Sequence, residues 1–487
     1  MRISTFSALL GLLALPASLV ACGSSDSDAT GAANELPVDA GTNGDASSET
    51  DAEPGDDGGV ADAGDDGGIV LPGAWQEVGA VVAGKKAKRT AIVTTPEGDA
   101  VLAIRESDAG PTLRVLRWRG DDTGAWDDLG IANTGVGGSL APSTDPHGRF
   151  VGLAFAGSHI VIAFRQNDAV YANVHDGSSW GTPFVLSADP SAIAVAGDRN
   201  RRALVVHRKS GDRVGARFYD ATTKAWSDEA IISPSDFTVD DADAFRVEAT
   251  MTTSGDALVV FRGRKAGQTQ THDVATIRYA AANDTWTAES AGALTDSLHP
   301  EQLCLATNDV GAAVVSLREQ YTNEHGTFLQ GRASYRKAGD SSWGEWVTIG
   351  GTVFHDACAI SPDGTAFVAS HVIVGSSSEI RISRYAGGAW SHGAVVAAKP
   401  STGSSRFVPS MTSGGKAAGA YFRNDSLIRL FRFAPGNGWI ASEDLKRTNP
   451  YSTSDDQLLK ASLLLEDGRF LWVYQDASGD IWYAVNR

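Results

Sequence analysis

Short apolar runs recur along most of the chain, and each is bounded by Gly, Asp or Asn. The runs at 247–253, 257–262 and 274–279 are typical, because each is rich in Val, Ile, Phe or Tyr and ends in turn-forming residues. No convincing long stretch repeats its apolar residues with the 3.6-residue period of an amphipathic helix. The pattern therefore predicts an all-β chain of many short strands.

Eight tryptophans share one local context, in which small or polar turn residues precede the Trp and a short strand follows it. Consecutive members are 51, 54, 46, 60, 57, 47 and 49 residues apart, with three further strand-like runs between them. Four strands every ~50 residues are typical of a β-propeller. The eight are Trp75, Trp126, Trp180, Trp226, Trp286, Trp343, Trp390 and Trp439.

The two ends of this repeat complement each other. After Trp439 there is room for three strands only, at 459–465, 470–474 and 480–485, whereas 75–82 is a fourth-type strand with no three strands before it. We predict that the N-terminal strand completes the last blade and closes a single propeller of eight four-stranded blades over residues 73–487, which protects the strand edges. Seven blades is the alternative if one unit is irregular.

The first 22 residues have the pattern of an export signal. Met1-Arg2 gives a positive start, residues 6–20 are apolar, and the run ends in Leu19-Val20-Ala21-Cys22. This tetrad resembles the lipobox of bacterial lipoproteins, and an ordinary secretory signal is the alternative. The resemblance implies that Cys22 carries several acyl chains, which anchor a protein stably in a membrane. Gly rather than Asp at residue 23 favours the outer membrane of the bacterial cell envelope.

Residues 23–72 are predicted to be a disordered acidic tether, because they hold 13 Asp or Glu, no Lys or Arg, and no aromatic residue. Their two Asp-Asp-Gly-Gly segments lack the closing Glu of an EF-hand, so a Ca²⁺ site is unsupported and we predict no cofactor. Residues 73–487, without the export signal and the tether, have a net charge of −6 instead of −18. This acidic balance argues against binding of nucleic acid, which requires a basic face.

The two cysteines of the predicted propeller occupy the same place in adjacent units. Cys304 lies five residues before Asp309, and Cys358 lies five residues before Asp363, on the first and innermost strand of units five and six. Disulfides persist in exported proteins. The pair is therefore either an inter-blade disulfide or two buried thiols, since inner strands can hold their Cα atoms beyond bonding range.

The second strand of six units ends in Arg. A motif repeated in most blades is more often architectural than functional, so we interpret these arginines as paired with carboxylates; the alternative is a ring of guanidinium groups that recognises carboxylate or phosphate. The two departures from the pattern are candidate binding positions. The series is Arg105, Arg165, Arg208, Arg262, Arg318 and Arg423, with His371 in unit six and Gln475 in unit eight.

The longest loops at the strand ends that carry these arginines belong to units four and five, at 233–246, 263–273 and 319–327, and long loops in a compact repeat tend to carry function. We place a candidate glycan site there, although the acidic part, from Asp236 to Asp243, is more often a solvated loop. The metal content of the site is left open, and no residue is assigned a catalytic role. The candidate binding residues are Arg262, Arg264, His272, Glu319, Tyr321, Glu324, His325, Asp240, Asp241, Asp243, His371 and Gln475.

The turns before Trp resemble the Asp-box of sialidase-type propellers, Ser-x-Asp-x-Gly-x-x-Trp. Fragments survive in Asp176-Gly-Ser-Ser-Trp180 and Asp220-Ala-Thr-Thr-Lys-Ala-Trp226, and residues 469–482 look like one repeat of the fucose-binding propeller lectins. The resemblance implies a propeller and no active site, because the Asp-box is not catalytic. We expect a monomeric, lipid-anchored binding module for a glycan or protein ligand. The alternative is a sialidase-like glycoside hydrolase, which would need a pair of carboxylates.

Overall fold

The computed structural model describes residues 75–486 apart from short gaps. The predicted export signal with Cys22 and the tether at 23–72 lie outside the described residues. The gaps are 83–86, 95–98, 107–111, 121–124, 139, 141–150, 190, 240–244, 268–272, 290–298, 324–325, 351–352, 375–376, 399–407, 412–416, 425–426, 435–437, 447–459, 465–468 and 476–479.

The described strands form eight antiparallel sheets, numbered here in chain order. Sheet 1 contains β2 (Ala87–Thr94), β3 (Ala100–Glu106), β4 (Thr112–Trp118) and β5 (Trp126–Ile131). Sheet 2 contains β6 (Val151–Ala156), β7 (His159–Gln166), β8 (Ala169–His175) and β9 (Phe184–Ser187). Sheet 3 contains β10 (Ile193–Gly197), β11 (Arg202–Lys209), β12 (Arg213–Asp220), β13 (Ala225–Trp226) and β14 (Ala230–Ile231). Sheet 4 contains β15 (Phe237–Val239), β16 (Val247–Met251), β17 (Ala257–Lys265), β18 (Asp273–Ala280) and β19 (Thr285–Glu289).

The second half of the chain continues the same plan. Sheet 5 contains β20 (His299–Thr307), β21 (Ala313–Asn323), β22 (Gly326–Arg336) and β23 (Val347–Gly350). Sheet 6 contains β24 (Val353–Ile360), β25 (Ala366–Val374), β26 (Ser377–Ala386) and β27 (Ala389–Ala398). Sheet 7 contains β28 (Val408–Met411), β29 (Ala417–Asn424), β30 (Leu427–Ala434) and β31 (Gly438–Lys446). Sheet 8 contains β32 (Lys460–Leu464), β33 (Phe470–Gln475), β34 (Ile481–Asn486) and β1 (Trp75–Val82).

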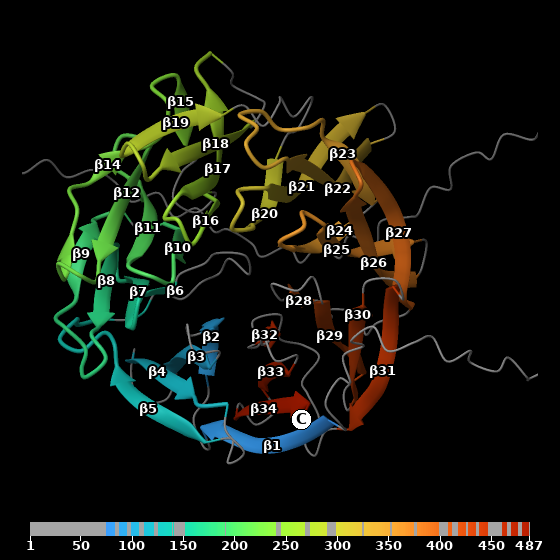
Figure 1. Cartoon of the computed structure of the whole chain (residues 1–487), viewed down its shortest axis with the longest axis horizontal. Helices are drawn as coiled ribbons and strands as arrows, with labels where there is room; N and C mark the ends of the chain where they lie inside the picture. Colours follow the sequence, from blue (N-terminus) through green and yellow to red (C-terminus); the bar gives the residue numbers. More distant parts are fainter. Residues whose placement is uncertain are drawn as a thin grey trace, which may run out of the picture. The chain divides into compact units, whose positions relative to one another are not determined.

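Strands that follow one another in the chain mostly pair side by side within a sheet, as Figure 1 shows. The exceptions are β14, which pairs with β12 beside β13, and β15 and β16, which both pair with β17. The protein is therefore all-β, with repeated four-stranded antiparallel sheets of the kind that build a propeller. The described part of the chain contains no helix long and apolar enough to cross a membrane.

The apolar core lies between neighbouring sheets. Val101 of β3 packs in one cluster with Ile162 of β7. The residue just before Ile162, Val161, packs instead with Val205 of β11. Successive residues of a strand point to opposite faces of the sheet, so β7 faces sheet 1 with one set of side chains and sheet 3 with the other. A strand covered on both faces is apolar without alternation, and β7 is buried along nearly its whole length.

The first strand of each sheet, or β16 in sheet 4, contacts the corresponding strand of the next, from β2 to β6 and onward to β32, and β32 contacts β2. Glycine permits the closest of these approaches. A Cβ on Gly197 of β10 would lie 2.0 Å from the carbonyl oxygen of Phe155, and one on Gly152 of β6 would lie 2.4 Å from Val195 Cγ2. Side chains at these two positions would force β6 and β10 apart.

Sheet 8 combines the first and last strands of the chain. β1 pairs antiparallel with β34, with Gln76 opposite Val485 and Gly79 opposite Tyr483. The N-terminal strand thus lies beside the C-terminal strand, in the place that the terminal strands of the repeat predict.

A disulfide joins Cys304 of β20 to Cys358 of β24. Their Cα atoms are 5.9 Å apart, within the range that a disulfide spans. Of the two alternatives that the sequence left open, the structure therefore has the inter-sheet bond, because the innermost strands of sheets 5 and 6 approach closely at this point.

Two segments predicted to be long loops are partly strands. β15 pairs with the end of β17, where Phe237 lies opposite Lys265 and Val239 opposite Gly263. Phe237 and Val239 are buried at alternate positions, which is the two-residue period of a strand. The many acidic residues of the segment conceal this period in the sequence. In sheet 5, β21 and β22 continue as one hairpin to the pair Asn323 and Gly326, so the predicted loop at 319–327 is mostly a strand extension.

Candidate ligand-binding site

The structure describes three side chains of the predicted site: Arg262, Arg264 and Glu319. Tyr321 of β21, His371 of β25 and Gln475 of β33 are described by their backbone alone. These positions belong to sheets 4, 5, 6 and 8. The remaining candidates lie outside the described residues and stay predictions: Asp240, Asp241, Asp243, His272, Glu324 and His325.

Glu319 is part of a buried cluster within sheet 5. Its side chain is 1 % exposed, and its Oε1 accepts hydrogen bonds from Arg332 Nη1 at 3.0 Å and from Gln330 Nε2. Arg262, on β17 of sheet 4, is also buried at 5 % exposure. The structure thus brings Glu319 together with two β22 residues that were not predicted to belong to a site.

At Arg208 the architectural interpretation of the recurring arginine holds. Its Nη1 pairs with Asp189, which lies in the connection between sheets 2 and 3, and its Nη2 pairs with Asp212 at the β11–β12 turn. The guanidinium group therefore ties a connection between two sheets to a hairpin of sheet 3.

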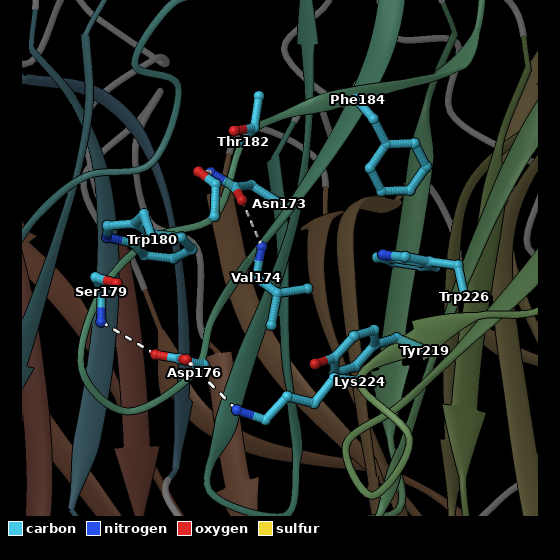
Figure 2. A pocket seen from close by; sticks show the side chains of 11 residues that line it. Asn173, Val174, Asp176, Ser179, Trp180, Thr182, Phe184, Tyr219, Lys224 and Trp226 are labelled. Atoms are coloured by element: carbon cyan, nitrogen blue, oxygen red, sulfur yellow. Dashed lines mark hydrogen bonds and ion pairs between the residues drawn. The ribbon is translucent and has the colours of Figure 1, made fainter.

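A hollow lies between sheets 2 and 3, at the strand ends opposite those that carry the recurring arginines. It has a volume of about 320 Å³, near the lower end of the ~300–1,000 Å³ of small-molecule sites. We call it the aromatic pocket (Figure 2). It is lined by Asn173, Val174, Asp176, Ser179, Trp180, Gly181, Thr182, Phe184, Tyr219, Lys224 and Trp226.

The two sheets contribute one tryptophan each to the aromatic pocket. Trp180, between β8 and β9, is fixed because its Nε1 donates to the Leu129 carbonyl at 2.8 Å. Across the pocket, the Trp226 ring meets Phe184 edge to face, with centroids 5.0 Å apart, and lies 5.4 Å from the Tyr219 ring. Figure 2 shows Trp180 on one side and Trp226 with Tyr219 on the other. Buried contacts thus hold both ring systems in place.

The degenerate Asp-box turns position the charged residues. Asp176 Oδ1 accepts hydrogen bonds from the Ser178 amide, the Ser178 hydroxyl and the Ser179 amide, at 3.1, 2.7 and 3.2 Å. These bonds stabilise the carboxylate and hold its pKa well below the usual range. The other oxygen, Oδ2, lies 3.6 Å from Lys224 Nζ, which reaches across from the β12–β13 turn. Asp220 organises that turn by accepting from the amides of Thr222 and Thr223.

One third-strand position beside the aromatic pocket carries a small residue. The position pairs with the second-strand residue four places before the recurring Arg, and it holds Val174 in sheet 2, Phe218 in sheet 3 and Tyr335 in sheet 5. It holds Arg117 in sheet 1, Arg278 in sheet 4 and a second, fully buried Val, Val485, in sheet 8. Phe218 stacks on Trp286 of sheet 4, with centroids 5.9 Å apart, and Tyr335 stacks on Tyr385 of sheet 6 at 3.8 Å. Large rings fill those gaps between sheets, whereas Val174 leaves its gap open.

Sequence reasoning missed this site because it treated Trp180 and Trp226 only as markers of the repeat. The available signal was Val174 between two turn tryptophans, at a position where the next sheet along the chain carries Phe218. A motif search gives no weight to such a change, since Val is an ordinary strand residue.

A smaller hollow of about 150 Å³ lies between sheets 4 and 5, where Arg278 and Arg336 alternate with Asp256, Asp309 and Asp340. Arg336 Nη1 is bound to the buried Glu289, at 2.7 and 2.9 Å from its two carboxylate oxygens. The charged side chains around this smaller hollow are thus close to one another. Among the described residues no group of three or more His, Cys, Asp or Glu side chains is arranged to hold a metal ion.

No family model matches the chain, and no curated protein matches it. Among solved structures, it is similar to a PL25-family ulvan lyase, with 11% identity, a TM-score of 0.45, and coverage of 82% of this chain and 94% of that one. It is also similar to the six-bladed propeller lectin of Aleuria aurantia, described with a fucose recognition mode (12%, 0.37, 75% and 97%), and to a fungal AA5 alcohol oxidase in complex with copper (12%, 0.40, 72% and 76%). All three TM-scores are below 0.5, so the site rests on the contacts described above.

Proposed function

We propose that the protein is a carbohydrate-binding module that holds a sugar ring in the aromatic pocket. The observation that carries this proposal is the pairing of Trp180 and Trp226 on opposite walls, with Asp176 and Lys224 at the mouth between them. A pyranose has faces of C–H groups and a rim of hydroxyls. Its C–H groups suit the negative face of an aromatic ring, and its hydroxyls suit a carboxylate and an ammonium group.

Binding fits the aromatic pocket better than sialidase-like hydrolysis. Glycoside cleavage uses two carboxyl groups that flank the scissile bond. Asp176 is the one carboxylate among the described lining residues, and its pKa is lowered, which is the opposite of what a general acid needs at neutral pH. We therefore propose a ligand-binding role without catalysis at this site.

We further propose that the eight sheets are the blades of one propeller and that β1 closes its ring. The succession of first-strand contacts that returns from β32 to β2 supports this, as does the β1–β34 pairing. A closed ring leaves no first or last sheet with an uncovered face. It also gives β34 a partner along the edge that would otherwise be free to pair with another chain.

The lipobox-like Cys22 and the acidic segment after it support a place for this module at the cell envelope. We propose that acylated Cys22 anchors the chain and that the tether carries the aromatic pocket away from the membrane surface. Mass spectrometry of the mature N-terminus tests this proposal: a chain that begins at Cys22 and carries acyl chains supports it, and an unmodified Cys22 contradicts it.

A glycan array probed with the wild-type protein and three variants tests the carbohydrate proposal. Trp180→Ala removes one wall, and Val174→Phe fills the aromatic pocket with the residue type found at position 218. We expect each to weaken glycan binding at least about fivefold, because stacking and burial of one sugar contribute on the order of 1–3 kcal/mol.

The matched control is Trp286→Ala, which changes the equivalent tryptophan in a gap that Phe218 fills. We expect this control to lose stability and to keep its glycan affinity. Binding by the wild type that survives both Trp180→Ala and Val174→Phe would place the ligand elsewhere. The absence of any glycan bound by the folded wild type would refute the function.

A further inference from the structure

We propose that the aromatic pocket selects uncharged sugars over acidic ones, with Asp176 and Lys224 as the residues that determine this specificity. The inference rests on the proposed carbohydrate-binding function and names the ligand class of that site: a neutral pyranoside, as opposed to a uronic or sialic acid or a sulfated sugar.

The charges of the aromatic pocket cancel. Asp176 and Lys224 are the charged residues among those that line it, and the other described lining residues are apolar, aromatic or uncharged polar. A site for an acidic sugar normally presents a net positive charge, often through Arg, which binds a carboxylate in two places at once. The described lining contains no Arg, so an anionic ligand gains no net attraction.

Most other polar atoms of the lining already have partners. Asn173 Nδ2 donates to the carbonyls of Ala132 and Gly181, at 2.7 and 3.1 Å. The Tyr219 hydroxyl shares a hydrogen bond of 2.8 Å with His159 Nδ1, and the Trp180 indole N–H is bound to a backbone carbonyl. Polar recognition of a ligand therefore falls mainly on Asp176 and Lys224.

The ion pair is spaced so that a hydroxyl group can join it. Asp176 Oδ2 and Lys224 Nζ are 3.6 Å apart, which is longer than a normal hydrogen bond, and the side chains are 38 % and 62 % exposed. A sugar hydroxyl can donate to the carboxylate while it accepts from the ammonium group, so it satisfies both. A ligand carboxylate or sulfate can satisfy Lys224 only, and it brings a second negative charge close to Asp176.

Asp176 cannot readily avoid this repulsion by taking up a proton. Its carboxylate is held by three hydrogen bonds from the turn at Ser178 and Ser179. Protonation would cost the stabilisation that these bonds give to the charged form. The negative charge at this wall of the aromatic pocket is thus a fixed feature at neutral pH.

The test compares methyl pyranosides with the matching methyl pyranosiduronates, which differ only in a CH₂OH or a carboxylate at C6. Affinities of the full chain for the glucose and galactose pairs are measured by calorimetric titration. We expect the neutral member of a bound pair to bind about tenfold more tightly, the size of effect that one close like-charge contact produces. In Asp176→Asn this preference disappears or inverts, because Lys224 then stands alone.

Asp176→Asn keeps an oxygen that can accept the turn hydrogen bonds. Asp176→Ser is the second variant, because it removes the charge without creating an Asn-Gly sequence. Asp363→Asn is the matched control: it makes the same change in a turn of sheet 6, where Asp363 accepts from the Thr365 amide at 2.9 Å and does not line the aromatic pocket. It should leave the ranking of the sugars unchanged.

The outcomes separate the two proposals. A neutral preference that both Asp176 variants abolish and the Asp363 control keeps supports the inference. Equal or tighter binding of the uronates by the wild type, or a ranking that the Asp176 variants do not alter, overturns the inference and leaves carbohydrate binding in place. If neither member of any pair binds, and a glycan array is also blank, the carbohydrate function itself fails.

Discussion

Removal of the Cys304–Cys358 disulfide tests how strongly sheets 5 and 6 depend on a covalent connection. The bond links the first strands of the two sheets, 54 residues apart in sequence. We consider the double variant Cys304→Ser/Cys358→Ser, in which both positions keep side chains of similar size and no unpaired thiol is left at the former bond.

The expected loss of stability follows from the length of the loop that the bond closes. A crosslink that closes a loop of about 54 residues lowers the entropy of the unfolded chain by about 14 cal/mol/K, or about 4 kcal/mol at 25 °C. The propeller segment of about 400 residues unfolds with an entropy on the order of 0.8 kcal/mol/K. We therefore expect the double variant to unfold about 5 °C below the wild type.

Calorimetry of the wild type and the double variant, each with and without reductant, measures this difference. Reductant should lower the wild-type transition to that of the variant and should leave the variant unchanged. Cys22→Ser, which changes the cysteine outside the bond, is the control and should respond to reductant as the wild type does. Two free thiols in addition to Cys22 in the oxidised wild type, or transitions within about 1 °C of each other, would refute the reasoning.

The remaining predictions concern pH and the chain ends. Burial lowers the pKa of His175, whose Nδ1 accepts from the Gly177 amide at 3.2 Å. The folded state then binds fewer protons than the unfolded state below the ordinary pKa of 6.5, so stability is full above pH 6.5 and falls on acidification toward the lowered folded pKa. The unfolding temperature measured from pH 7.5 to 5 should therefore fall on acidification, and it should fall less steeply in His175→Asn than in the wild type. Equal slopes for the two proteins would contradict a role of His175. Deletion of β1 should lower the unfolding temperature and cause self-association in size-exclusion chromatography, whereas deletion of 23–72 should not; a stable monomer without β1 would argue against ring closure.

Much of the sheet architecture could be predicted from the sequence, because its signals are local and repeated. Each Trp stands at a turn that leads into a fourth strand, and the spacing of these turns sets the length of a sheet unit. Cys304 and Cys358 fall at equivalent positions, which was enough to place them on neighbouring first strands but not to decide whether they are bonded. That decision depends on the distance between two strands, which no local pattern encodes.

The candidate site was less predictable for a physical reason. The aromatic pocket results from what is missing at one position, since Val174 occupies a place that Phe218 fills one sheet later. Long loops, in contrast, are easily recognised in a sequence. Part of the acidic segment is nevertheless a strand, because Phe237 and Val239 alternate on its buried side. Whether a gap between sheets is empty depends on pairs of side chains from units about 50 residues apart.

The repeated gap has a consequence for how such a chain gains or loses ligands. Val174 stands beside the vacancy between sheets 2 and 3, whereas Phe218 occupies the corresponding place between sheets 3 and 4, so an exchange of a ring for a small side chain at this position changes the room between two such sheets. A duplicated scaffold of this kind can therefore change its valency in steps of one. Two or more simultaneous contacts with a polymeric ligand raise the effective strength of attachment far beyond that of each contact alone.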